Sequence, residues 1–441
     1  MRATDTAALP KELLETAVAG RAQLTPGLSR QAALARFLKR GFPSIRAEDW
    51  KYTDLTAAID VTRDWLARGA TSDIPDSLLG DAAALTGNID ASWIVIGNGQ
   101  IVGDLPFSPD NKGANDKRGD AGGIVVERLS QAAVEPTIDH PLADFNAALL
   151  TDGLHIRIPQ GATPSRPLGL LFLDQTADQS SVSLPRVVVD VAAGAQLAMI
   201  EYHVSKGSGG HYSNAHVELN VADGSQVDYV RLQHRDRAHS QTERLNVTLA
   251  RDARFHHFAL DLGGALTRND LAIDIRGPGA EARFDGLYIA GDGQHIDNHT
   301  RIDHRVGPAR SAQEYRGILR GQCQAVWNGK AIVHEGADGT DAVQGNHNLL
   351  LSEGAEIDAK PELEIYADDV KCAHGTTVGQ LDEDAVFYLR SRGIELPDAE
   401  RILTHAFAAR IVEELPIDRL TDMVNTLIDR RLGDSLAVES A

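Results

Sequence analysis

A short turn motif recurs along the middle of the chain at nearly constant spacing, and this repeat limits the fold more than any other sequence feature. Its turn residues Gly194, Gly224, Asp252 and Gly279 lie 30, 28 and 27 residues apart, and the flanking residues alternate between apolar and polar. Alternation with a period of two is typical of β-strands, and a strand–turn–strand unit that repeats without a helix is typical of stacked rungs. The sequence therefore predicts a mainly β chain built around a β-helix, or solenoid. A two-sheet jelly roll is the alternative, because antiparallel hairpins also space turns regularly.

The segment before the repeat has helical patterns and one hairpin signal. Ser29 is a suitable N-cap and Gly41 a suitable end for a helix between them, and residues 92–102 read as a hairpin. Trp50 and Tyr52 are expected to anchor this helical segment on the next domain, with a ligand-stacking pair as the alternative.

The pattern becomes helical again after the repeat. Two amphipathic helices are predicted there, the first beginning at Asp398 and the second ending at Gly433. We expect them to cap the last rung of the solenoid and to offer a docking surface. The chain is therefore divided into an N-terminal helical and mixed region (1–148), a β-helix core (149–384) and a C-terminal helical domain (385–441).

Composition excludes several classes of function. The chain has 441 residues and a net charge of −20, which repels phosphate backbones and anionic lipids and argues against nucleic acid or membrane as a partner. The only two cysteines, Cys323 and Cys372, form neither a disulfide framework nor a complete zinc or cluster ligand set. With no basic-then-apolar leader and no apolar run of ~20 residues, the sequence predicts a cytoplasmic location.

The usual catalytic motifs are missing from the sequence. There is no phosphate-binding loop, no Gly-x-Ser-x-Gly elbow and no His-Glu-x-x-His helix. Two classes of enzyme are the alternatives to a non-catalytic protein. A carbohydrate-active β-helix needs paired carboxylates and aromatic residues, and a content of only 5% aromatic residues disfavours it. A metal-dependent enzyme could use His295, His299 and His304, since His295, Asp297 and His299 share one face of a strand.

Cys372 and His374 are the residues that most suggest chemistry. They follow an alternating strand at 361–367 and lie two residues apart. In an extended chain they point to the same side, about 7 Å apart along the strand. A thiolate and an imidazole are both ligands for iron and other transition metals. The alternative is a buried thiol beside a hydrogen-bonded histidine.

With these residues in view, the chain resembles the SufB/SufD family of the SUF iron–sulfur cluster assembly system. Residues 360–375 read KPELEIYADDVKCAHG and are similar to the family signature, as are residues 384–394, DAVFYLRSRGI. Residues 48–53, EDWKYT, match the N-terminal pattern that the two branches share. Proteins of the SufB branch are usually longer, have more cysteines and tend to have glutamate at the position of His374. The resemblance is therefore to the SufD branch.

The resemblance implies a right-handed parallel β-helix between helical ends, and a non-catalytic scaffold subunit. It implies pairing with a SufB-type paralogue and binding of a SufC-type ATPase through the C-terminal helices at about 385–432. The nascent cluster would form at the interface between the two paralogues, with His374 as a ligand and Cys372 as a weaker second candidate. The cluster would be transient and shared, with no cofactor held tightly by the isolated chain. Flavin (FADH2) is associated with the whole complex, at a place that this sequence does not indicate. A homodimer is allowed when the paralogue is missing.

Overall fold

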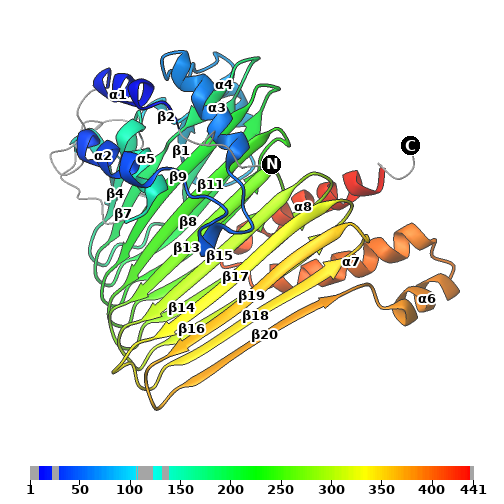
Figure 1. Cartoon of the computed structure of the whole chain (residues 1–441). Helices are drawn as coiled ribbons and strands as arrows, with labels where there is room; N and C mark the ends of the chain where they lie inside the picture. The colour runs from blue at the N-terminus through cyan, green and yellow to red at the C-terminus, as the bar shows by residue number, and fades with distance from the viewer. Residues whose placement is uncertain (1–8, 22–28, 106, 108–122, 132–138, 438–441) are drawn as a thin grey trace.

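The computed structural model describes residues 9–21, 29–105, 107, 123–131 and 139–437. The protein is mainly β: a parallel β-solenoid of about 8 turns, flanked by helices from both ends of the chain (Figure 1). The prediction of a solenoid with flanking helices is confirmed. Among the described helices, none combines the length and the apolarity that a membrane span requires.

Two sheets form the solenoid. Sheet A contains, in spatial order, β2 (Gln100–Val102), β1 (Ser92–Gly97), β5 (Leu168–Gln175), β8 (Gln196–Lys206), β10 (Gln226–His234), β12 (Arg254–Asp261), β14 (Glu281–Ala290), β16 (Arg310–Leu319), β18 (Asp341–Leu350) and β20 (Lys371–Gly379). Sheet B contains β19 (Ala355–Ile365), β17 (Cys323–Val333), β15 (His295–His304), β13 (Leu266–Ile275), β11 (His239–Leu249), β9 (His211–Val221), β7 (Arg186–Val191), β4 (Gly153–Ile158) and β3 (Val125–Arg128), while β6 (Ser181–Ser183) pairs with β9.

Parallel pairing distinguishes this fold from a jelly roll. Successive strands of the repeat alternate between the sheets, and each pairs in parallel with the strand one turn away, as β10 does with β8 and β12. The turn residues of the repeat stack in the same way. Gly194, Gly224 and Gly279 have φ angles of 68°, 66° and 76°, and Asp252 has 55°. A left-handed turn conformation, which glycine tolerates best, therefore recurs on every turn of this segment.

The interior between the sheets is apolar along one side and polar along the other. On β8, Leu197 and Met199 face inward into the apolar core. Glu201 and His203 continue the same face and are fully buried. The outward residues Ile200 and Tyr202 lie in a second apolar cluster. The inner face of the solenoid therefore contains charged residues, while part of its outer face is apolar.

The N-terminal region contains α1 (Lys11–Ala19), α2 (Arg30–Arg40), η1 (Glu48–Trp50), α3 (Thr56–Ala67), α4 (Leu78–Thr86), η3 (Leu129–Gln131) and α5 (Pro141–Leu149). The predicted cap of α2 is confirmed, because the Ser29 hydroxyl accepts from the Ala32 N–H and Gly41 follows the helix with a φ of 70°. The predicted hairpin is also confirmed as β1 and β2, and it extends sheet A.

The C-terminal region contains α6 (Glu383–Ser391), α7 (Leu396–Val412), η4 (Asp418–Leu420) and α8 (Thr421–Ala437). The N-cap of α7 is Glu395, so Asp398 lies in the first turn of the helix. Pro397 before it fits there, because backbone N–H groups in the first turn have no partner within the helix. α8 continues past Gly433, which a helix tolerates at a cost of ~1 kcal/mol.

α7 and α8 cover the outer face of sheet A and not the end of the solenoid (Figure 1). Ile411, Val424 and Ile428 pack against the outward-facing Leu232 and Phe258 in one apolar cluster. The expectation that these helices cap the last rung is wrong, because the exposed outer apolar face of sheet A gives them a larger surface to bury. The last rung is left open in the described part of the chain.

Candidate functional site

The last rung of the solenoid has two free edges. β20 stands at the end of sheet A and β19 at the end of sheet B, so among the described strands each has a partner on one side only (Figure 1). Apolar side chains are exposed here: Ile365 is 43% exposed, Tyr366 62% and Val378 53%. A free sheet edge is a template for pairing with another strand.

Cys372 and His374 lie on β20 at this open end. They are in register with Ala342 and Gln344 of β18, which are buried inside the solenoid. Cys372 and His374 therefore face the interior side by side, as the strand pattern predicts. Cys372 is partly buried and His374 is exposed, because no further rung in the described residues covers them. Burial raises the pKa of the Cys372 thiol.

These two side chains form an incomplete ligand set. An iron–sulfur cluster takes about four protein ligands, and one strand here offers one thiol and one imidazole. The other cysteine, Cys323, is buried at the start of β17 in the opposite sheet, where burial raises its pKa to about 11. A metal or cluster at Cys372 and His374 therefore needs ligands from a molecule that covers the open end.

The histidine-rich strand β15 does not bring its three histidines together. His295, Asp297 and His299 share the outer face of sheet B, whereas His304 is fully buried on the inner face and contacts the Ser311 hydroxyl at 2.9 Å. The ligand set of His295, His299 and His304 is therefore wrong, since residues an odd number apart face opposite sides of a strand.

The outer face of β15 holds the N-terminal segment in place. Asp297 accepts from Arg268 Nη1 at 2.7 Å and from the Thr53 hydroxyl, and it lies 3.0 Å from His299 Nε2. The Arg268 guanidinium also lies 3.9 Å from the Trp50 ring. Trp50 is therefore an anchor, as predicted, while Tyr52 is only half-buried and stacks with a lysine.

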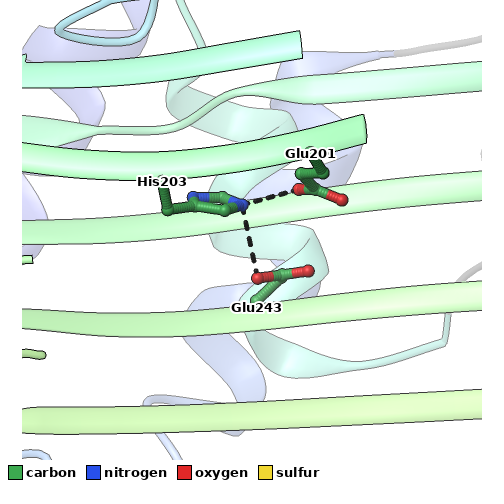
Figure 2. A group of neighbouring side chains, drawn as sticks. All are labelled: Glu201, His203 and Glu243. Atoms are coloured by element: carbon green, nitrogen blue, oxygen red, sulfur yellow. Dashed lines mark hydrogen bonds and ion pairs between the residues drawn. The ribbon is translucent and has the colours of Figure 1, made fainter. Parts of the chain in front are cut away.

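A third group, Glu201, His203 and Glu243, lies inside the solenoid (Figure 2). His203 Nε2 lies 2.7 Å from Glu201 Oε1 and 3.5 Å from Glu243 Oε2. On the other side of the ring, Arg235 Nη2 lies 3.3 Å from His203 Nδ1. Because arginine only donates, Nδ1 accepts and the ring hydrogen is on Nε2, between the two carboxyl groups. A metal would need that Nε2 lone pair, so this group is a hydrogen-bonded network.

We expect Glu201 to be protonated below about pH 7 in this network, and a substitution tests it. Burial raises the pKa of Glu201 from 4.5 to about 7 and lowers the pKa of His203 to about 3. A carboxyl group whose pKa is higher in the folded than in the unfolded protein contributes stability below its unfolded pKa. That contribution is lost as the pH rises to its folded pKa. Glu201→Gln stays neutral, so its stability relative to wild type should rise between pH 4.5 and 8 by on the order of 3 kcal/mol.

Urea denaturation at several pH values measures this difference. The exposed substitution Glu356→Gln should show no such trend. A relative stability of Glu201→Gln that stays flat with pH would mean that Glu201 is ionised in the folded protein.

The C-terminal helices leave a second exposed surface. α6 has no buried residue, and its Phe387 and Tyr388 are 73% and 54% exposed. A groove of about 470 Å³ runs between α6, α7, α8 and the C-terminal ends of β14, β16 and β18, lined by Phe387, Arg390 and Leu351 among others. Large exposed apolar side chains beside a groove are typical of protein-binding surfaces.

Comparisons with known proteins show the family of this chain. Residues 172–407 match the family model described as SUF system FeS cluster assembly, SufBD core domain. The iron–sulfur cluster assembly protein SufD of Escherichia coli is 31% identical over 91% of this chain and 92% of its own length. A SufBD family protein of Synechocystis is 28% identical over 91% and 90%, and SufD of Bacillus subtilis is 25% identical over 67% of each chain.

The matched residues include both β20, with Cys372 and His374, and the strands that form the polar interior. The chain belongs to the SufB/SufD family of SUF-system iron–sulfur cluster assembly proteins, on its SufD branch.

Proposed function

We propose that the protein is a non-catalytic scaffold subunit of a SUF assembly complex. A SufB-type paralogue covers the open end of the solenoid, and nascent iron–sulfur cluster forms at that interface with His374, and with Cys372 as a second ligand. The observation that carries the proposal is the last rung: both sheet edges are free, and an incomplete pair of iron ligands faces the uncovered interior.

A SufC-type ATPase is proposed to bind the C-terminal helices. The exposed Phe387 and Tyr388 on α6, with the adjoining groove, support this site. Because α7 and α8 pack on sheet A, movement of a bound ATPase would act on the same body that carries the open end. ATP-driven closure of two such ATPases would then strain the interface and expose or cover the cluster.

The cluster is cargo in this proposal and not a resident cofactor. It is held jointly with the partner, and the isolated chain retains little metal. Any flavin would belong to the whole complex, a homodimer is allowed when the paralogue is missing, and the location is cytoplasmic. A relative from Arabidopsis, ABCI7, is described as chloroplastic.

The test is co-expression with the SufB- and SufC-type proteins of the same organism, followed by anaerobic size-exclusion chromatography with iron and sulfide assays. We expect one complex that contains this chain and bound cluster. His374→Ala should leave the complex intact, because the side chain is exposed and makes no packing contact that the fold needs, and should lower its iron and sulfide content by about tenfold. A chain that elutes alone, or a His374→Ala complex with full cluster content, would overturn the proposal.

A further inference from the structure

Two buried glutamines stand in line behind His374. Gln313 of β16 is in register with Gln344 of β18, and Gln344 is in register with His374 of β20. All three face the interior, on parallel strands about 4.8 Å apart. We call Gln313, Gln344 and His374 the interior column. It runs from the closed part of the solenoid to the open end.

The inner end of the column is oriented by Thr300 of β15. Its Oγ1 lies 2.7 Å from Gln313 Oε1, a distance typical of an O–H donor, and 3.4 Å from the backbone oxygen of Asn328. Thr300 therefore donates to Gln313 Oε1. The other amide atom, Gln313 Nε2, has no acceptor among the described residues.

Gln344 is buried without a partner. It is 3% exposed, and neither Nε2 nor Oε1 forms a hydrogen bond with any described residue. Leaving a buried amide unpaired costs ~1–3 kcal/mol, so such a group calls for a specific explanation. No hydrogen bond joins Gln344 to Gln313, and its other neighbour in register is His374, on the open side next to Cys372. Gln344 Nε2–H is therefore available to a group held at the open end.

We propose that Gln344 donates its Nε2–H to an anionic sulfur atom held beside His374 and Cys372, either a metal-bound sulfide or the Cys372 thiolate. The inference rests on the proposed function, because it takes the open end as the place where sulfur and iron meet. Gln344 is a positioning residue for this site. Hydrogen bonds to cluster sulfur are a recognised means by which a protein holds and tunes a cluster.

The test compares stability with cluster retention in the co-expressed complex. Gln344→Leu removes an unpaired buried amide, so the unfolding midpoint of the isolated chain should stay equal or rise. The iron and sulfide retained by the complex should fall by about tenfold. Gln344→Glu, which replaces the N–H donor by oxygen, should also lower retention. Gln322→Leu, on an exposed turn, is the matched control and should change neither quantity.

The outcomes separate this inference from the proposed function. Full cluster retention in Gln344→Leu, with loss in His374→Ala, overturns the role of Gln344 alone. Full retention in both variants overturns the proposed function. A Gln344→Leu chain that is clearly destabilised shows a structural role and overturns the inference too. Adding Gln344→Leu to a Cys372→Ser variant identifies the sulfur atom. If Gln344→Leu lowers cluster retention there as much as in wild type, the acceptor is sulfide. If it lowers retention no further, the acceptor is the Cys372 thiolate.

Discussion

Arg231→Ala is expected to destabilise the protein by ~3–5 kcal/mol, because it leaves two buried carboxylates without their cation. Arg231 faces the polar side of the interior and is 2% exposed. Its Nη2 donates to Asp261 Oδ1 at 2.8 Å and its Nη1 to Glu243 Oε2 at 3.3 Å. Burial alone would lower the pKa of Arg231, but these carboxylates raise it. The guanidinium therefore stays charged and holds both carboxylates in place.

Urea denaturation of three variants separates charge from packing. Arg231→Met keeps most of the volume and should lose nearly as much stability as Arg231→Ala. The triple variant Arg231→Met, Glu243→Gln, Asp261→Asn should recover at least half of that loss, since neutral side chains leave no buried charge. Arg254→Ala on the exposed surface, where Arg254 lies 3.7 Å from Glu281, should change stability by less than ~0.5 kcal/mol. A triple variant as unstable as Arg231→Met would show that packing, not charge, dominates.

Thr376→Pro is expected to weaken binding of the SufB-type partner at least about tenfold while the isolated chain stays folded. The Lys371 N–H donates to the Thr340 oxygen on the β18 side at 2.8 Å. Alternate residues of a strand direct their N–H groups to the same neighbour, so the N–H of Thr376 points to the free edge. Proline removes that N–H and is tolerated on an edge strand. Only the bond to an added strand is lost.

Size-exclusion chromatography with the partner and thermal melting of the isolated chain check this result. Thr376→Val is the matched control, because it keeps the backbone N–H and a β-branched shape at an exposed position. It should bind like wild type. Equal loss in both variants would assign binding to the side chain, and full binding by Thr376→Pro would show that the partner does not pair with this edge.

Several site residues could be placed from the sequence because the period of two fixes which side chains share a face. Cys372 and His374 were predicted to face the same side, and both point into the open end. The same rule separates His304 from His295 and His299 and argues against the three as one ligand set. Which of these side chains share a face of a strand can therefore be read from the sequence.

The polar interior could not be recognised in the same way. On β8 the pattern of Met199, Ile200, Glu201, Tyr202 and His203 suggests polar residues outside and apolar residues inside. The structure has Glu201 and His203 inside, and Ile200 and Tyr202 outside, in the apolar cluster to which α7 and α8 also contribute. Alternation distinguishes two faces but does not say which is the interior once helices cover the outer one.

The sequence by itself determined the strands, the spacing of the turns and the shared face of Cys372 and His374 on their strand, because these depend on neighbours a few residues apart. Only the tertiary structure decided that the helices cover sheet A and leave the last rung open, and that Gln313 and Gln344 stand in register behind His374. Those relations join residues about one solenoid turn or more apart in the chain, and they follow from how successive turns align and from which apolar surface is largest.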